Sequence, residues 1–318
     1  MSAWGARLAG ATALAGLGSL AWALAETSMF ALRTHEVPVL PAGARPLRVL
    51  HLSDLHLVPS QRHKVAWVRD LGRLEPDLVI TTGDNMAHPD AMPSVLEAYA
   101  PLLERPGAFV LGSNDYFAPY PKNPARYLLP DARTDPGDER VHLPAEELAD
   151  AFRRAGWQDL TNRRDAVTVA GTDLSFVGVD DPHLEYDRFP APDGAAGTRG
   201  AHPGTAGRPR LRLGVTHAPY RRVLDAMHAD GCDLVLAGHT HGGQLCVPGF
   251  GALVTNSDLD RSRASGLHGW PGPRPGARGG EDSTWLHVSA GLGTSPYAPV
   301  RFACRPEACL LTLVPRPA

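Results

Sequence analysis

The sequence is poor in cysteine and has no strong excess of charge of either sign. Its four cysteines, Cys232, Cys246, Cys304 and Cys309, never form the C-x-x-C spacing that is typical of structural zinc sites. A disulfide between Cys304 and Cys309 would require an oxidising compartment, and free thiols in or near the core are the favoured alternative. The net charge of -3 argues against a general nucleic-acid-coating role, so no nucleic-acid partner is expected.

Long apolar runs are scarce, and one of them lies at the amino terminus. Leu8–Ala25 contains no charged residue, and its length of about eighteen residues is at the lower limit for a membrane-spanning helix. An uncleaved membrane anchor is favoured, with the side of the membrane open. A cleaved signal ending near Ala25 and a soluble amphipathic extension are the alternatives. Three prolines between residues 38 and 46 predict a stiff connector. The expected organisation is an apolar segment over 1–33, a linker over 34–46 and a folded domain over 47–318.

After residue 46, short apolar runs alternate with segments of helical periodicity. The runs predict strands over 47–52, 78–82, 108–111, 166–170, 174–179, 211–215, 234–237, 285–288 and 309–314. Helices are predicted over 62–74, 93–103, 144–155 and 221–229. Alternation of strands and helices, followed by strand pairs, indicates an α/β sandwich with mixed sheets. Segments rich in proline and glycine, with insertions expected at 190–209 and 256–283, predict surface loops.

Ligand-type residues directly follow five of the predicted strands. They occur as Ser53-Asp54-Leu55-His56, Gly83-Asp84-Asn85, Gly112-Ser113-Asn114-Asp115, Thr216-His217 and Gly238-His239-Thr240-His241. In open α/β sheets, ligands bind beyond the carboxyl ends of the strands. A single Asp or His after a strand is commonly a cap, but five such tips in order, two of them doubled, indicate a metal site.

The residue types at these tips favour divalent cations. Imidazole, carboxylate and amide ligands without thiolates suit borderline metals such as Mn, Fe, Co, Ni and Zn. In the Asp-x-His and His-x-His motifs, side chains two positions apart lie on the same side of an extended segment. Both members of each pair are therefore expected to face one cluster.

The order of these motifs resembles that of the calcineurin-like metallophosphoesterase superfamily, which has the pattern D-x-H, G-D, G-N-H-D/E, H and G-H-x-H. The resemblance covers about residues 46–315. The segments His51–Leu57, Gly238–Gln244 and Gly291–Ser295 are more narrowly similar to a bacterial branch. That branch holds membrane-associated phosphodiesterases and enzymes similar to UDP-2,3-diacylglucosamine pyrophosphatases. The resemblance implies a four-layer αββα sandwich of two mixed β-sheets flanked by helices.

The resemblance also implies a set of ligands for two divalent metal ions. It places Asp54, His56 and His241 on one metal and His217 and His239 on the other, with Asp84 bridging the two. Two such cations clamp the attacking and leaving oxygens of an in-line displacement. A hydroxide that bridges both cations would be the attacking group near neutral pH.

The third motif departs from the superfamily pattern. Where Asn and then His are expected, the chain has Ser113 and then Asn114. A direct alignment puts the hydroxyl of Ser113 at the second metal, whereas a shift of one residue lets Asn114 supply an amide oxygen. The shift is favoured because an amide suits the coordination better. Asn114 and Asp115 are the candidate catalytic residues, and the identity of the proton donor stays open.

These residues predict a dinuclear phosphoesterase whose substrate is a phosphate ester, and a phosphodiester or pyrophosphate is favoured. Loss of a general acid costs about 10²–10⁴-fold in rate unless the leaving group is already good. The alternatives are a phosphomonoesterase or protein phosphatase of the same fold, and a metal-binding membrane protein with weakened catalysis. Because the amino terminus is apolar, a lipid-linked phosphate ester is a further candidate substrate. The sequence carries no signal for an oligomeric state.

Other polar residues are interpreted as structural. His51 lies inside the first strand and is predicted to be a core residue. The stretch Asp180–His183 is favoured as a turn over a lining of the site. His35 has no constellation of ligands around it, and His287 is predicted to be buried and satisfied.

Overall fold

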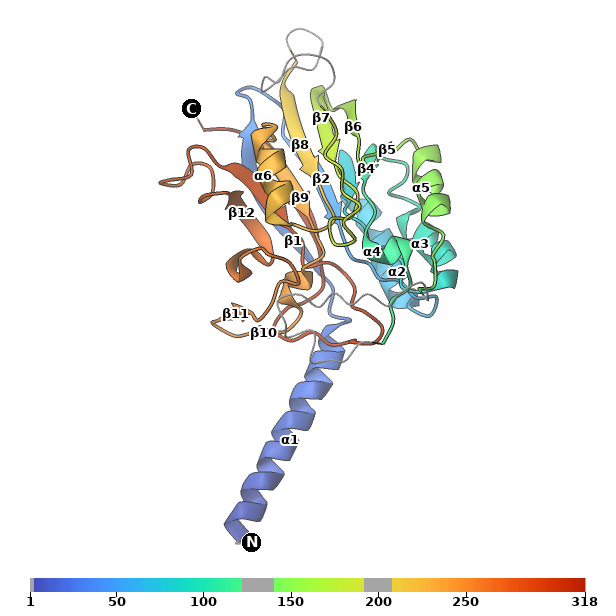
Figure 1. Ribbon diagram of the computed structural model, residues 1–318, viewed down its shortest axis with the longest axis vertical. Coiled ribbons are helices and arrows are strands. Elements are labelled where there is room, and N and C mark those ends of the chain that lie inside the picture. The colour runs from blue at the N-terminus through green and yellow to red at the C-terminus, as the bar shows by residue number, and fades with distance from the viewer. Residues whose placement is uncertain (1–2, 122–139, 192–207, 318) are drawn as a thin grey trace.

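The computed structural model describes residues 3–121, 140–191 and 208–317, and its body consists of two β-sheets with helices around them (Figure 1). The first sheet has the strand order β1-β14-β2-β3-β4-β5. Its strands are β1 (Ala31–Leu40), β14 (Glu307–Pro315), β2 (Leu47–Leu52), β3 (Leu78–Thr81), β4 (Gly107–Phe109) and β5 (Gln158–Asp159). Strands β2 to β5 are parallel, β14 is antiparallel to β2, and β1 is parallel to β14.

The second sheet has the strand order β12-β13-β9-β8-β7-β6. Its strands are β12 (Gly266–Trp270), β13 (Thr284–Val288), β9 (Leu234–Ala237), β8 (Arg210–Val215), β7 (Thr172–Gly178) and β6 (Arg164–Val169). The four central strands are parallel, whereas the edge strands β12 and β6 are antiparallel to their neighbours. A separate two-stranded ribbon joins β10 (Cys246–Val247) and β11 (Gly251–Ala252).

Alternating side chains of the strands build three apolar layers. Leu50 and Leu52 of β2 pack with helices α2 (Arg62–Asp70), α3 (Met92–Tyr99) and α5 (Ala145–Arg154). The alternate residue Val49 lies between the two sheets with Leu213 and Leu236. Helix α6 (Arg221–Ala229) covers the far face of the second sheet. The two mixed sheets therefore lie between helical layers, which confirms the predicted αββα sandwich.

The predicted connector over 34–46 is wrong for its first part. Residues 31–40 form β1, which pairs in parallel with β14, and Val37 and Val39 are buried between the sheets. Proline is tolerated in a strand at the edge of a sheet, where its missing N–H removes no ladder bond. Pro38 lies in this edge strand, so the proline-rich composition of the segment hid a strand.

The predicted surface insertions have different outcomes. The one at 256–283 contains strand β12, which completes the second sheet. The one at 190–209 lies for its greater part outside the described residues. All four cysteines are free, so the alternative of a Cys304–Cys309 disulfide is wrong.

Helix α1 (Ala3–Glu26) projects from the body, and its last turn is docked on the body (Figure 1). The carbonyl of Ala23 accepts a hydrogen bond from the N–H of Arg301 at 2.9 Å. The buried carboxylate of Glu26 accepts from the N–H groups of Ala303 at 3.1 Å and Cys304 at 2.6 Å. Exposed apolar side chains on the helix are Trp4, Leu14, Leu17, Leu20, Trp22 and Leu24. In the part of the chain that the structure describes, no helix combines the length and the apolar character that a membrane crossing requires.

Candidate metal centre

The polar residues that follow β2, β3, β8 and β9 meet at one edge of the two sheets. The ligand-type atoms of Asp54, His56 and His241 lie within 4.8 Å of one another, and so do those of Asp54, Asp84 and His217. In the first group, the Nε2 atoms of His56 and His241 are 3.2 Å apart, and Nε2 of His241 is 3.6 Å from Oδ1 of Asp54. Five expected ligands from four separate strands are thus brought together.

Asp84 lies between the two groups of histidines. Its Oδ2 is 3.3 Å from Nε2 of His56, and its Oδ1 is 3.6 Å from Nε2 of His217. Nε2 of His217 is in turn 3.2 Å from Nδ1 of His239. The two oxygens of one carboxylate therefore face one histidine of each group.

The backbone of this centre is strained rather than extended. Asp54, His56, Asp84, His239 and His241 all have positive φ, between 42° and 67°. This left-handed region is uncommon for residues other than glycine and costs about 1–3 kcal/mol each. The expectation that Asp-x-His and His-x-His converge because extended side chains alternate is therefore wrong in its reason. The side chains converge because the chain leaves each strand in a sharp, strained turn.

Backbone carbonyls fix the orientation of three histidines. A carbonyl oxygen can only accept, so Nδ1 of His217 donates to Thr82 O at 2.7 Å and Nδ1 of His241 donates to Gly293 O at 3.0 Å. Nε2 of His239 likewise donates to Asn256 O at 3.1 Å. In the neutral form of each imidazole, the other ring nitrogen carries a lone pair that can bind a cation. This arrangement is characteristic of metal-bound histidine, whose second nitrogen donates to a carbonyl or carboxylate.

The centre brings potential metal ligands together in a buried space, where burial favours the uncharged forms of His56, His241 and Asp84. Burial lowers the pKa of His241 to about 4 and lowers that of His56 well below its usual 6.5, so both rings are neutral at pH 7. Burial and the neighbouring Asp54 carboxylate raise the pKa of Asp84 well above its usual 3.8. Nδ1 of His56 is buried and has no hydrogen-bond partner among the described residues. Imidazoles and carboxylates that face one another at 3.2–3.6 Å fit divalent cations between them once their protons are displaced.

Metal affinity should increase with pH because of His217. Burial lowers the pKa of this imidazole, but the carboxylates of Asp84, Asp181 and Asp54 raise it to about 9 in the metal-free protein. A cation must displace that proton, so its affinity should rise by up to about tenfold per pH unit from about pH 7 and level off above about pH 9. Calorimetric titration of the metal-free chain with Mn²⁺ at several pH values would measure this. An affinity that is independent of pH across that range would contradict the assignment.

The third motif forms a short helix, α4 (Ser113–Tyr116), directly after β4. The backbone N–H of Asn114 donates to Oδ1 of Asp84 at 2.6 Å, whereas its side-chain Nδ2 donates to Phe117 O at 3.0 Å. Ser113 and Asn114 both line the cavity over the centre. A Cβ on Gly112 would overlap Oδ1 of Asp84, so glycine lets this loop approach the centre closely.

Asp115 is completely buried beneath this loop. Its carboxylate accepts hydrogen bonds from the N–H groups of Gly112 at 3.0 Å, Asp84 at 2.9 Å and Asn85 at 2.8 Å. These contacts join the third motif to the second. They favour the interpretation of Asp115 as a loop organiser that positions Asp84.

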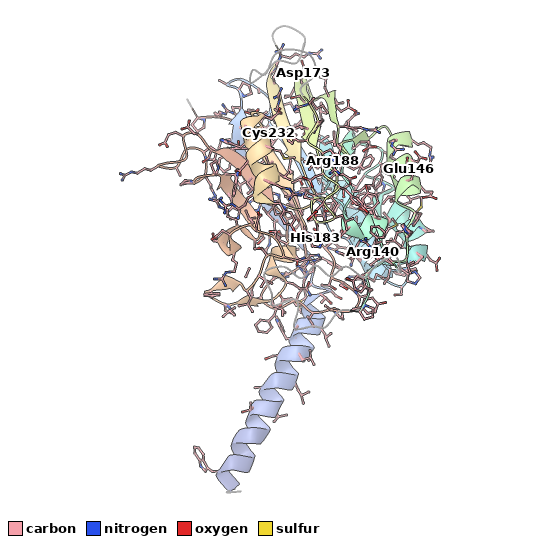
Figure 2. All side chains as sticks on the ribbon, in the orientation of Figure 1. Arg140, Glu146, Asp173, His183, Arg188 and Cys232 are labelled. Atoms are coloured by element: carbon pink, nitrogen blue, oxygen red, sulfur yellow. The ribbon has the colours of Figure 1, made fainter. Side chains whose placement is uncertain are left out.

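A cavity of about 780 Å³ opens over the cluster, and further polar side chains line it. His183 lines it, and its ring centroid is 4.5 Å from that of His239. His183 therefore reaches the site, although the stretch 180–183 was favoured as a turn. Arg140 lines the same cavity and lies over the ring of Phe117 at 4.0 Å. Figure 2 shows both residues in the lower half of the body, the half from which α1 projects.

Arg301 is a further residue that no local pattern indicated. Its guanidinium is fully buried and donates to the carbonyls of Ala290 and Gly293 at 2.7 Å each, and to that of His241 at 3.4 Å. It thus holds the segment around Gly293, whose carbonyl orients the His241 ring. The motif Gly291–Ser295 precedes Arg301 in the sequence, but that motif did not indicate a role for an arginine.

Comparison with known proteins decides the family. Residues 47–243 match the calcineurin-like phosphoesterase family. The chain belongs to this family. It is therefore a hydrolase that acts on phosphoric esters, and the family implies divalent metal ions at the cluster of Asp and His side chains.

Several curated relatives of this phosphoesterase match over most of its length. It is 26% identical to phosphodiesterase YaeI of Escherichia coli K12 over 296 residues, which are 91% of this chain and 90% of that protein. It is 25% identical to the UDP-2,3-diacylglucosamine pyrophosphatase LpxG of Chlamydia trachomatis, covering 85% of this chain and 84% of that protein. It is 29% identical to a transmembrane protein with metallophosphoesterase domain from Bos taurus, covering 90% of this chain and 58% of that protein. The first two names support the bacterial branch indicated by the motifs.

Proposed function

We propose that this phosphoesterase uses two divalent cations to hydrolyse a phosphodiester or a pyrophosphate. The observation that carries the proposal is the position of Asp84, whose two carboxylate oxygens face His56 and His217 at 3.3 and 3.6 Å. A carboxylate placed in this way is suited to bridge two cations. Mn, Fe, Co, Ni and Zn all suit the set of imidazole and carboxylate donors.

The chain supplies the ligands and their orientation. Asp54, His56, His241 and Asp84 would hold one cation, and Asp84, His217, His239 and Asn114 would hold the other. When bound, the cations supply a water acidified for in-line attack and neutralise the charge of the phosphoryl oxygens. Asp115 fixes the loop that carries Asn114 through its contact with Gly112 N–H, and Arg301 fixes the backbone that orients His241.

The proton for the leaving group requires a side chain outside the third motif. Asn114 stands where the superfamily pattern has histidine, and an amide does not titrate near neutral pH. His183 lines the cavity beside His239, and its Nδ1 lies 3.1 Å from the hydroxyl of Tyr220, which orients the ring. His183 therefore takes the role of proton donor to the leaving oxygen.

His183→Gln is expected to slow hydrolysis according to the leaving group. With a poor alkoxide leaving group, kcat should fall about 10²-fold, whereas a nitrophenolate, which leaves without a proton, should lose little. Steady-state rates on a series of diesters of graded leaving-group pKa would measure the dependence. His63→Gln, at an exposed histidine on α2, is the control. An equal loss on every diester would indicate a purely structural role for His183.

The cavity and α1 support a lipid-linked substrate at a membrane. Apolar side chains, including Phe117, Leu253 and Tyr297, share the cavity wall with the polar cluster. The body carries this cavity on the side from which α1 projects with its exposed leucines and tryptophans. Helix α1 thus holds the enzyme at a membrane, and the phosphate of an amphiphilic substrate reaches the metal centre while its apolar part contacts the wall. The name of the LpxG relative, which includes a diacylglucosamine, is in line with this substrate class.

A comparison of substrates tests the proposed reaction. The Mn²⁺-loaded full chain should hydrolyse bis-p-nitrophenyl phosphate and a vesicle-borne diacyl pyrophosphate faster than p-nitrophenyl phosphate. A chain that begins at Trp22 keeps the docked turn around Glu26, and it should lose turnover only on the vesicle-borne substrate. A preference for the monoester would instead establish a phosphomonoesterase. No turnover with two cations bound would indicate weakened catalysis.

A further inference from the structure

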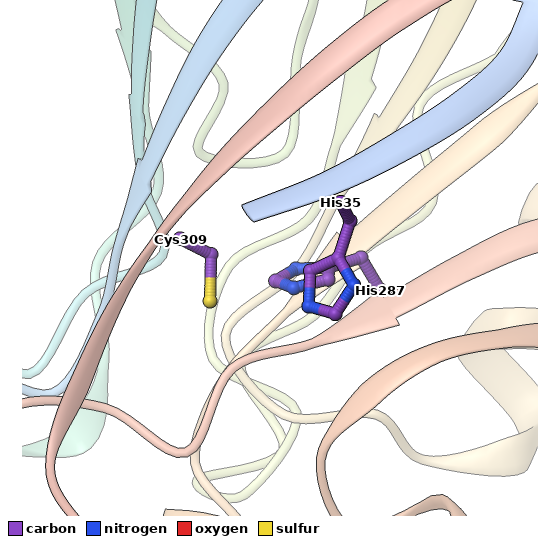
Figure 3. Close-up of side chains that lie close together, drawn as sticks. All are labelled: His35, His287 and Cys309. Carbon is purple, nitrogen blue, oxygen red and sulfur yellow. The ribbon is translucent and has the colours of Figure 1, made fainter. Parts of the chain in front are cut away.

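A second group of metal-binding side chains lies between the two sheets, away from the phosphoesterase centre. His35 of β1, His287 of β13 and Cys309 of β14 have ligand-type atoms that all lie within 4.8 Å of one another. Figure 3 shows the His287 ring extending from its strand toward Cys309, with the His35 ring beside it. His287 and Cys309 are completely buried, and His35 is partly exposed at the edge strand. The partly exposed His35 gives a route from solvent into the group.

A chain of hydrogen bonds determines which nitrogen of His287 carries its proton. Ser53 Oγ donates to the Asp54 carboxylate, and Thr82 Oγ1 donates to Ser53 Oγ at 2.7 Å. With its only proton used in that bond, Thr82 must accept from Nε2 of His51 at 3.1 Å. Burial lowers the pKa of His51 to about 3, so its ring is neutral and its Nδ1 is an acceptor.

His287 must then donate to His51 and keep a bare lone pair. The two Nδ1 atoms are 2.9 Å apart, and His51 can only accept there. Burial lowers the pKa of His287 well below its usual value, so this ring is also neutral. Its Nε2 therefore carries no proton, and it has no hydrogen-bond partner among the described residues. The sequence prediction of a buried histidine is correct, but the prediction that it is satisfied is wrong.

The remaining groups suit a cation rather than a hydrogen-bond donor. The Cys309 thiol donates to Oε1 of Glu307 at 3.6 Å, and burial together with this carboxylate raises the pKa of the thiol, so its proton leaves only when a cation binds the sulfur. Glu307 also pairs with Arg33 at 3.5 Å, which places this carboxylate beside the group without making it a ligand. Two imidazoles and a thiolate are the ligands of zinc and of cuprous ion. A ligand histidine that donates its other N–H to a fixed partner, as His287 does to His51, is typical of metal sites.

We propose that His35, His287 and Cys309 form a further metal site, distinct from the phosphoesterase centre, for a thiophilic cation such as Zn²⁺ or Cu⁺. Binding replaces the proton of Cys309, which leaves to solvent, and no redox step is needed. The bare Nε2 of His287 is the preformed ligand, and His35 closes the site from the partly exposed side. The bound cation would tie together β1, β13 and β14, and hence the two sheets.

Cobalt as a spectroscopic substitute for zinc tests this site on the full chain. Co²⁺ bound to a thiolate gives a charge-transfer band in the near ultraviolet, whereas the proposed phosphoesterase ligands contain no sulfur. The metal-free protein should develop this band on addition of Co²⁺ and lose it on addition of Zn²⁺. Cys309→Ser should abolish the band, and His35→Gln should reduce it by more than half.

Matched variants separate this site from the other thiols and from the proposed activity. Cys304→Ser, at the thiol beside the carbonyl of His241, should keep the full band. If Cys309→Ser does not fold, the loss of the band in His35→Gln tests the proposal instead. His35 is partly exposed at an edge strand, so its substitution should leave the fold intact. Diester hydrolysis with Mn²⁺ should be unchanged in His35→Gln. The band depends on the thiolate of Cys309 and not on hydrolysis, so it should appear even if the proposed activity is absent. A folded chain that binds Co²⁺ without a thiolate band, or a band that survives Cys309→Ser, would overturn the proposal.

Discussion

Asp84→Asn is expected to lower kcat/KM for bis-p-nitrophenyl phosphate by about 10³-fold or more, which corresponds to about 4 kcal/mol of transition-state stabilisation. The two carboxylate oxygens of Asp84 face histidines of both groups, at 3.3 and 3.6 Å. An amide presents one oxygen and one NH₂ group, so it cannot offer negatively charged oxygens to two cations. Metal analysis should show that the variant retains at most one cation per chain.

The fold should survive this change. Burial raises the pKa of Asp84 well above its usual value in the metal-free chain, so a neutral amide relieves a desolvation cost there. Thermal unfolding without metal should therefore be unchanged or slightly more stable. Asp70→Asn, at an exposed carboxylate of α2 that pairs with Arg73, is the matched control and should retain activity. A variant that keeps two cations and full turnover would refute the role of Asp84.

Gly238→Ala is expected to have the second largest effect, although it adds one methyl group. A Cβ at this position would overlap Oγ of Ser53 and lie 2.6 Å from Oδ2 of Asp54. The carboxylate must therefore move, and a displacement of about 1 Å at a reacting centre costs about 10²-fold in rate. Overpacking of this kind also destabilises by about 1–3 kcal/mol. Rates and metal affinity should fall together, and both would be measured on the purified variant.

Gly238→Ala tests only the steric effect of the added methyl group, because the backbone of Gly238 suits alanine. Its φ lies outside the left-handed region, so alanine adds no conformational strain there. Gly18→Ala on α1, where a Cβ would meet no atom within 4 Å, is the control. Normal activity in Gly238→Ala would mean that Asp54 does not need its observed position.

The positions of the site residues could be predicted because the signal is local. Each ligand-type residue directly follows an apolar strand, and parallel strands end at one edge of a sheet. Asp54, Asp84 and His217 could therefore be assigned to one centre without knowledge of the packing. The strained turns could not be predicted, because positive φ at Asp54 and His239 is imposed by the surrounding structure.

Residues that act over long distances in sequence gave no local signal. Arg301 reaches His241 from a loop sixty residues later, and it is buried only because carbonyls from several turns accept its protons. The sequence favoured a turn at His183. Its ring faces the cavity because β7 and β9 lie in one sheet, and no local pattern in the sequence predicts that arrangement. Strand β1 was missed for the same reason, since its pairing partner β14 lies at the other end of the chain.

The central claim is that Asp84 bridges two cations that together activate the substrate. Electron paramagnetic resonance of the Mn²⁺-loaded chain tests it most directly, with diester turnover followed on the same samples. We expect the spectrum of a spin-coupled manganese pair to grow with the second equivalent of Mn²⁺, together with turnover, and to be absent in Asp84→Asn. Full turnover with one uncoupled Mn²⁺ per chain would contradict the account.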